Sequence, residues 1–441
     1  MHQMFTFLQP SDAELPETLR ACAELVGLDH PENLTTTRVQ ESLQRSLPKL
    51  SEAERAGRLS GQDVWTSKEW MDNFWKTVQL EERPLDELRA DPAYNIATSS
   101  GSTGEQKIVL QEEELLDERR DAENAVWAYS EPWFVAIVNR PTNLFAVKDE
   151  FDEFRFEETD ADLKVTPGAN PTTATSDAWR RVAHSIRRSN PTVLAGDAQY
   201  LVSLMPYLAR DELPSLRHVV VSNHVSWSFQ RRMLEAHFGL PVQILYHSGE
   251  LSMMATSCRH QSWHLLETFA CYEVFHQSEA RNDETGLLLA TTMDSKVRPL
   301  VRYPLGDIGR IDESLCPCGD RRRRVVLEGR TTYTFPARSG GWVTLKAVDE
   351  SLSRVQGLSH LALSFREDQI VLEAVALCGQ EPVVPVDQLK ALTGYPVHVN
   401  SSSNLKLLTP GGKLSVFESS TTLTEEHFIK STDPVRFVRQ S

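Results

Sequence analysis

Short apolar runs alternate with stretches of helical periodicity between residues 190 and 250. The apolar runs, each of which predicts a buried strand, lie at 191–196, 217–222 and 242–246. The helical stretches between them lie at 198–209 and 228–239. A strand–helix–strand–helix–strand order at this spacing predicts a parallel sheet with crossover helices. Because ligands of such sheets bind beyond the carboxyl ends of the strands, YHSGE at 246–250 is a candidate site.

The pattern changes in the C-terminal part of the chain. Apolar runs at 360–365 and 369–377 predict a hairpin. DQLKALTG at 387–394 predicts a short helix, and YPVHVN at 395–400 predicts another strand. This β-β-α-β order is typical of a small α+β domain.

The chain length of 441 residues predicts two or three domains, because a single hydrophobic core stops growing well below that size. The change of pattern indicates a boundary near Arg330. We therefore expect an α/β fold, with a large N-terminal α/β domain at 1–330 and a smaller C-terminal α+β lid at 331–441.

Composition and charge exclude several classes of protein. A hydrophobic share of 40% and a charged share of 24% are ordinary for a folded chain, which excludes a wholly disordered one. With 46 Lys and Arg against 62 Asp and Glu, the net charge is −16, so we expect no general nucleic-acid binding. No apolar stretch is long enough to span a bilayer, and the N-terminus lacks the features of a signal peptide. We expect a cytoplasmic protein with no membrane partner and with reduced cysteines.

The segment TSSGSTGEQKIVL at 98–110 combines hydroxyl residues, glycines and a lysine in one loop. Gly101 and Gly104 permit close approach of the backbone, and Lys107 adds a positive charge. Hydroxyls and backbone N–H groups in such a loop are suited to bind phosphate oxygens, and the hydroxyl residues are Ser99, Ser100, Ser102 and Thr103. The Walker A pattern is absent, and an ordinary Ser/Gly-rich turn is the alternative interpretation.

SSGSTGEQK resembles the phosphate-binding loop of the acyl-adenylate-forming enzymes, which include acyl-CoA synthetases, adenylation domains and luciferases. Four further segments are similar to motifs of that superfamily and occur in its order, namely YHSGE at 246–250, VRYPLGD at 301–307, LEGR at 327–330 and TPGGK at 409–413. The VRYPLGD stretch followed by CPCG at 316–319 is similar to the phenylacetate-CoA ligase type.

The resemblance implies a reaction in two steps. A carboxylic acid, by the same resemblance aryl or arylacetic, would attack ATP to give an acyl adenylate and pyrophosphate, and CoA would then displace AMP. Two alternatives stay open. The acyl group could pass to an amine, another nitrogen nucleophile or a carrier protein, or the chain could be a zinc-stabilised binding protein without turnover. The joint presence of Lys413, Glu250 and Asp307 argues against the second alternative.

The resemblance also implies roles for single residues around ATP. The loop at 99–107 would hold the pyrophosphate side, and Tyr246 would lie against adenine. Asp307 would accept hydrogen bonds from the ribose hydroxyls, and Arg330 would lie near the ribose or phosphate. From the residues alone, Asp307 and Arg330 could equally form a surface ion pair.

Catalytic roles implied by the resemblance fall on Lys413, Glu250 and Thr103. Lys413 would reach the α-phosphate and the carboxylate, and Glu250 would hold Mg²⁺, which prefers carboxylate and phosphate oxygens. The sequence departs from the superfamily most clearly at Thr332, where an acidic residue or lysine commonly forms the hinge between domains. Thr332 therefore leaves the usual two-conformation cycle with CoA in doubt.

A second group of residues has the composition of a zinc site. Cys258 and His264 lie in TSCRHQSWH, and Cys316 and Cys318 lie in CPCG, where Pro and Gly favour a tight turn. Three cysteines and one histidine form a tetrahedral zinc ligand set, which would be structural because it is closed. Four unrelated residues are the alternative, with His260 as a competing imidazole. The remaining cysteines are interpreted as core thiols, and they are Cys22, Cys271 and Cys378.

Four consecutive arginines at 321–324 follow the CPCG turn. Most charge runs pair with nearby acidic residues, and an anchor for the 3′-phosphate of CoA or for an acidic carrier protein is the alternative. The expected partners are thus a small carboxylic acid and CoA or another acyl acceptor, and a homodimer is left open.

Overall fold

The structure is a computed structural model of the 441-residue chain. It describes residues 92, 94–98, 108–112, 134–141, 153–222, 226–267, 270–276, 279–280, 284–292, 300, 302–377, 380–405, 416–431 and 434–438. Several residues singled out above lie outside these ranges, namely the loop at 99–107, Lys413, Cys22 and Cys378.

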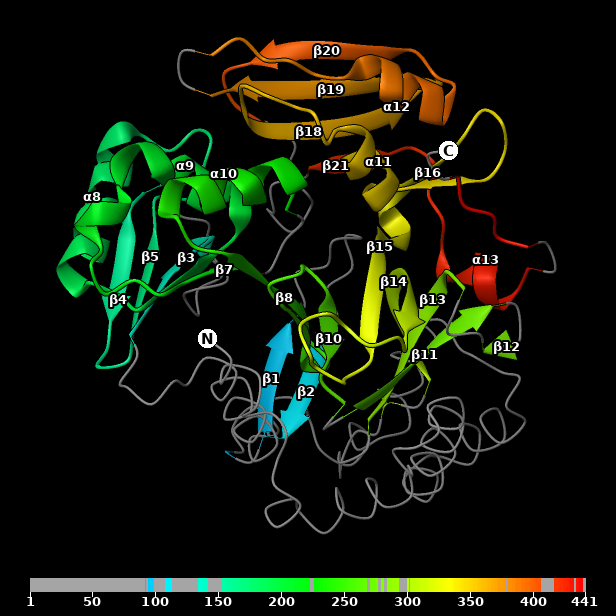
Figure 1. Ribbon diagram of the computed structural model, residues 1–441, viewed down its shortest axis with the longest axis horizontal. Helices are drawn as coiled ribbons and strands as arrows, with labels where there is room; N and C mark the ends of the chain where they lie inside the picture. The colour runs from blue at the N-terminus through cyan, green and yellow to red at the C-terminus, as the bar shows by residue number, and fades with distance from the viewer. Residues whose placement is uncertain are drawn as a thin grey trace.

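One large sheet crosses the structure, with strand order β12-β11-β13-β14-β15-β10-β9-β8-β7-β6-β3-β5-β4 (Figure 1). Its parallel half consists of β5 (Asp162–Thr166), β3 (Val135–Val138), β6 (Val193–Gly196), β7 (His218–Val221) and β8 (Val242–Ser248). At the edge, β4 (Arg155–Glu158) pairs antiparallel with β5. The helices of this half are α8 (Ser176–Ser189), α9 (Ala198–Leu204) and α10 (Ser228–Phe238). The predicted strand–helix alternation and α/β fold class are confirmed.

The ends of the helices follow from local residues. α9 is shorter than the predicted 198–209, because Pro206 lacks the N–H that a continuing helix needs, and the chain forms the 3₁₀ turn η4 (Met205–Tyr207) instead. A second such turn, η5 (Arg210–Glu212), follows. α10 ends at Phe238 because Gly239 takes the left-handed conformation with φ 62°.

The strand predicted at 242–246 is longer than expected. β8 extends to Ser248 because it forms an antiparallel hairpin with β9, in which Tyr246 lies opposite Ala255. The first three residues of YHSGE therefore lie within the strand, which runs two residues further than the predicted 242–246. Glu250 lies in the turn between the two strands.

Beyond β8 the large sheet is antiparallel. Its strands are β9 (Ser252–Ser257), β10 (Trp263–Leu265), β11 (Ala270–His276), β12 (Glu279–Ala280), β13 (Gly286–Thr292), β14 (Tyr303–Asp312) and β15 (Arg324–Arg330). The part of the VRYPLGD motif from Tyr303 to Asp307 forms the start of β14, and the LEGR motif forms the end of β15. Adjacent antiparallel strands therefore bring these two motifs side by side.

The C-terminal part forms a second sheet with strand order β20-β19-β18-β21, above the large sheet in Figure 1. The predicted hairpin is confirmed as β18 (Leu358–Arg366) and β19 (Gln369–Ala376), and the predicted helix as α12 (Val386–Thr393). The other elements are η6 (Thr331–Tyr333), β16 (Thr334–Pro336), β17 (Trp342–Thr344), α11 (Leu345–Ser351), β20 (Val397–Ser402), β21 (Phe417–Ser419) and α13 (Glu425–Ile429).

The C-terminal sheet packs closely against α9 and α10. Trp227, fully buried at the start of α10, belongs to the apolar cluster that forms the core under β18 and β19. Its indole Nε1 donates a hydrogen bond of 2.8 Å to the Leu361 carbonyl. His360 on β18 is also buried, and its Nε2 donates to the Gln199 carbonyl at 2.9 Å. Side chains from both parts of the chain thus share one interior.

Candidate nucleotide site and metal centre

Three residues predicted to surround a nucleotide lie together. Asp307 on β14 lies opposite Arg330 on β15, and 3.7 Å separate Asp307 Oδ1 from Arg330 Nε. Asp307 Oδ2 accepts a hydrogen bond of 2.7 Å from the Tyr246 hydroxyl on β8. Arg330 Nη2 also donates to the Leu305 carbonyl at 3.0 Å. Three strands therefore contribute to one polar cluster around a buried carboxylate.

The charges in this cluster stabilise one another. The nearby Asp307 carboxylate raises the pKa of Arg330 against the opposing effect of burial. Burial raises the pKa of the Tyr246 hydroxyl, and the charge of Asp307 and the hydrogen bond to it raise that pKa further. Tyr246 is therefore a neutral donor and Arg330 a cation at neutral pH, so the cluster combines a carboxylate, a guanidinium and a hydroxyl.

Only glycine fits at position 306, next to Asp307, because of its backbone conformation and the Arg330 side chain beside it. The φ of Gly306 is 74°, and a Cβ at this position would lie 2.9 Å from Arg330 Nη2. Any larger residue would strain the backbone and push the guanidinium away. The glycine of VRYPLGD thus allows Arg330 to lie against the backbone of β14.

Glu250 lies close to the same cluster. Its Oε1 accepts a hydrogen bond of 3.0 Å from the Tyr303 hydroxyl, and its charge contributes to the raised pKa of Arg330 behind the larger effect of Asp307. A half-buried carboxylate beside a nucleotide site is chemically suited to Mg²⁺, because this ion binds through one or two carboxylates plus phosphate oxygens.

The sequence reasoning missed two residues at this site, Tyr303 and Tyr333. The pKa of Tyr333 is raised, mainly by burial, and the carboxylates of Asp307 and Asp197 raise it further while the Arg330 charge opposes them. Tyr333 therefore lies within electrostatic range of Arg330 and both carboxylates. Asp197 directly follows β6 and caps α9. It therefore lies at the carboxyl edge of the parallel strands, where its position after an apolar run could have marked it.

The predicted phosphate loop is flanked by two described strands. β1 (Tyr94–Thr98) and β2 (Ile108–Glu112) pair antiparallel with Thr98 opposite Ile108, so the loop at 99–107 connects them at one end of a hairpin. The roles implied for Ser99 to Lys107 and for Lys413 stay predictions, because those residues lie outside the described part of the chain.

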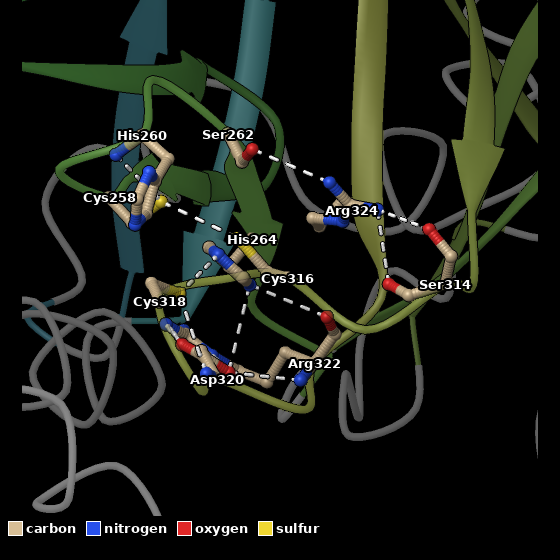
Figure 2. A network of polar contacts seen from close by, with 10 residues as sticks. All are labelled: Cys258, His260, Ser262, His264, Ser314, Cys316, Cys318, Asp320, Arg322 and Arg324. Carbon is tan, nitrogen blue, oxygen red and sulfur yellow. Dashed lines mark hydrogen bonds and ion pairs between the residues drawn. The ribbon is translucent and has the colours of Figure 1, made fainter.

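The four predicted metal ligands form one cluster, shown in Figure 2. Their ligand atoms all lie within 4.8 Å of one another, with 3.8 Å between the sulfurs of Cys258 and Cys316 and 3.3 Å between Cys318 Sγ and His264 Nε2. Cys258 follows β9, His264 lies on β10, and the CPCG turn follows β14. His260 is exposed and lies outside the cluster, so His264 is the imidazole of this site.

Hydrogen bonds around the cluster suit metal-binding thiolates. The backbone N–H groups of His260 and Asp320 each donate to a cysteine sulfur at 3.4 Å, to Cys258 and Cys318 respectively. His264 Nδ1 donates to the Arg322 carbonyl at 3.4 Å and lies 3.7 Å from Asp320 Oδ1, and these contacts favour the ring orientation in which Nε2 faces the sulfurs. Three thiols and one oriented imidazole match the donor set of structural zinc, so these residues fit that ion.

Three of the four arginines at 321–324 pair with acidic residues. Arg322 bonds Asp320, Arg323 pairs with Glu267 and Glu313, and Arg324 Nη2 lies 2.7 Å from Asp312 Oδ2. The nearby carboxylate of Glu267 raises the pKa of Arg323 although burial opposes it. These ion pairs brace the loop that carries Cys316 and Cys318, which favours the structural interpretation of the run.

No protein-family model and no curated protein matches the chain. Solved structures do match. A 2-hydroxyisobutyryl-CoA ligase in the postadenylation state, in complex with an acyl-AMP, matches with a TM-score of 0.65 at 12% identity, over 94% of this chain and 96% of that one.

Two other ligases match over a smaller part. The anthranilate CoA ligase AuaEII with anthranoyl-AMP has a TM-score of 0.52 at 14% identity, and ATP-bound MatB from Rhodopseudomonas palustris has 0.51 at 16%. Each match covers 72% of this chain and 65% of the other. The fold of this chain is therefore similar to that of the matched CoA ligases. None of the helices in the described part of the chain is long and apolar enough to cross a membrane.

Proposed function

We propose that this protein is an ATP-dependent, AMP-forming ligase that activates a carboxylic acid as an acyl adenylate and transfers the acyl group to CoA. The observation that carries the proposal is the cluster of Tyr246, Asp307 and Arg330 with Glu250 beside it, on a fold similar to such ligases. The ordered motifs from 98 to 413 support the same conclusion.

The residues supply binding and charge compensation. Asp307 is placed to accept hydrogen bonds from ribose hydroxyls, since Tyr246 occupies one of its oxygens and each carboxylate oxygen can accept more than one bond. Arg330 balances the charge of Asp307 and adds positive potential for phosphate. Bound Mg²⁺ would neutralise phosphate charge, and Glu250 would hold it. Lys413 and the loop at 99–107 would complete the site, because phosphoryl-group chemistry depends mainly on positioning and charge stabilisation.

An aryl or arylacetic acid is the proposed substrate. The motif similarity to phenylacetate-CoA ligases supports it. CoA is the proposed acceptor, and an amine, another nitrogen nucleophile or a carrier protein is the alternative. Thr332, which replaces the usual hinge residue, keeps this alternative open.

We also propose that the cluster of Cys258, His264, Cys316 and Cys318 holds a structural zinc ion. The closed set of four ligands, with backbone N–H groups on two sulfurs, supports a structural site. Reduced thiols are needed for this role, which supports a cytoplasmic location. We place the domain boundary at residue 330, where β15 ends and η6 begins.

The test is ATP–pyrophosphate exchange over a panel of aliphatic, aryl and arylacetic acids. Exchange that depends on an aryl acid is the expected result, and product analysis with and without CoA then identifies the acceptor. Asp307→Asn should lower the exchange strongly, whereas Asp312→Asn on the same strand should not. The absence of exchange with every acid would contradict the proposal.

A further inference from the structure

Arg302, the arginine of the VRYPLGD motif, forms a buried ion pair with Glu273. Arg302 Nη2 lies 2.6 Å from Glu273 Oε1 and its Nε donates to the same oxygen at 2.7 Å, and both side chains are almost fully buried. The guanidinium also lies 5.5 Å from the centre of the Phe275 ring. Two residues of β11 thus contact the Arg302 guanidinium.

Arg302 has an unusual backbone conformation. Its φ is 49°, in the left-handed region that residues with a Cβ rarely adopt. Its backbone N–H donates to Thr291 Oγ1 at 2.9 Å. Strained conformations of this kind persist only where the surrounding structure holds them, and they concentrate at functional sites. The ion pair and the hydrogen bond to Thr291 contribute to holding it here.

The backbone conformation of Arg302 determines on which face of the sheet the next side chain, Tyr303, lies. Tyr303 opens β14 opposite Ala290, and its ring is buried in the apolar cluster that includes Tyr272 and Val274. Glu273 and Phe275 alternate with these two residues along β11 and therefore face the other side of the sheet. The chain is thus anchored on one face through Arg302 and presents Tyr303 on the opposite face.

The Tyr303 hydroxyl forms a hydrogen bond with the carboxylate of Glu250. The O–H donates to Glu250 Oε1 at 3.0 Å, while the ring is only 1% exposed. A ring fixed by packing holds its hydroxyl in place before any ligand arrives. One oxygen of Glu250 is thereby oriented, in the turn between β8 and β9 where the backbone alone would leave several rotamers open.

We propose that Tyr303 is a positioning residue that orients the Glu250 carboxylate toward Mg²⁺ of the bound MgATP, and that the Glu273–Arg302 pair fixes Tyr303. The inference rests on the proposed function, in which Glu250 holds that ion. Partners that orient a metal-binding carboxylate commonly contribute to metal affinity without touching the metal.

The test is Tyr303→Phe, which removes the hydroxyl and keeps the ring. Binding of ATP, without acid, is measured by calorimetry in the presence of Mg²⁺ and again in the presence of a chelator. MgATP affinity should fall about tenfold, while affinity for metal-free ATP should stay unchanged. Tyr200→Phe is the matched control, because Tyr200 is equally buried and its hydroxyl donates to the carbonyls of Gly168 and Ala169 away from Glu250.

A double-mutant comparison separates positioning from a general structural role. In a Glu250→Gln background, adding Tyr303→Phe should have no further effect on MgATP affinity. An equal effect in both backgrounds, or an equal loss of MgATP and metal-free ATP binding, would overturn the inference. If the wild-type protein shows neither ATP binding nor acid-dependent exchange, the proposed function itself fails. If the wild-type protein shows both and Tyr303→Phe binds MgATP equally well, only the inference about Tyr303 fails.

Discussion

Removal of zinc should lower the free energy of unfolding by an amount that follows from the length of the chain segment that the ion closes. The proposed ion would connect the β9–β10 hairpin to the loop after β14 through Cys258 and Cys316, which are 58 positions apart. A covalent cross-link that closes a loop of this length stabilises a protein by about 4 kcal/mol through the entropy of the unfolded chain. A tetrahedral ion with four protein ligands constrains the chain in a comparable way. Chelation should therefore lower the melting temperature by about 4 °C, because the entropy of unfolding of a chain of this length is about 0.9 kcal/mol/K.

The assay combines metal analysis with thermal unfolding. Elemental analysis should find one zinc per chain, and Cys316→Ser should reduce both the zinc content and the melting temperature. Cys271→Ser is the matched control, because Cys271 is also a buried thiol but lies on β11 outside the ligand cluster. Protein without zinc, with Cys316→Ser as stable as the control, would refute the reasoning.

Three further perturbations have defined outcomes. Trp227→Ala should destabilise the protein by about 3–5 kcal/mol in denaturant unfolding, because it removes a fully buried ring from the core of the C-terminal sheet. A loss below about 1 kcal/mol would contradict this packing. Burial lowers the pKa of His360 to about 4, so stability should fall by about 3 kcal/mol as the pH falls from 6.5 to 4, because the unfolded chain binds the proton first. His360→Asn should flatten this part of the stability profile, and an unchanged slope would refute the assignment. Gly306→Ala should weaken ATP binding because a Cβ meets Arg330, whereas Gly340→Ala, at φ 89° with open space around it, should not; equal binding by the two variants would contradict the argument.

The parallel half of the fold could be predicted from the sequence because its signals are local. Strands such as β6 and β7 are continuous apolar runs, and α10 ends at a glycine suited to the left-handed conformation. The prediction for α9 was too long because the apolar periodicity continues through Pro206, which the pattern of hydrophobic positions does not register.

The candidate site could be predicted only in part. Motif similarity singled out Tyr246, Asp307 and Arg330, but the hydrogen bond between Tyr246 and Asp307 depends on how β8 and β14 approach across the sheet. The role of Tyr303 was missed because its meaning depends on Glu250, which lies on a different hairpin. Contacts between distant segments follow from strand order, and a single sequence does not specify strand order.

The metal cluster was predictable for a different reason. Its ligand types are rare in the chain and have few competing explanations, so their identity alone suggested a site. The choice of His264 over His260 needed the structure, because both lie in one short segment and only the pairing of β9 with β10 turns His264 toward the sulfurs.

The most direct test of the central claim is the fate of ATP when the protein is incubated with Mg²⁺ and an aryl or arylacetic acid. We predict acid-dependent formation of pyrophosphate, with an acyl-AMP detectable by mass spectrometry in a single turnover, and release of an equal amount of AMP once CoA is added as acceptor. Formation of ADP and phosphate, or no consumption of ATP with any acid of the panel, would contradict the account.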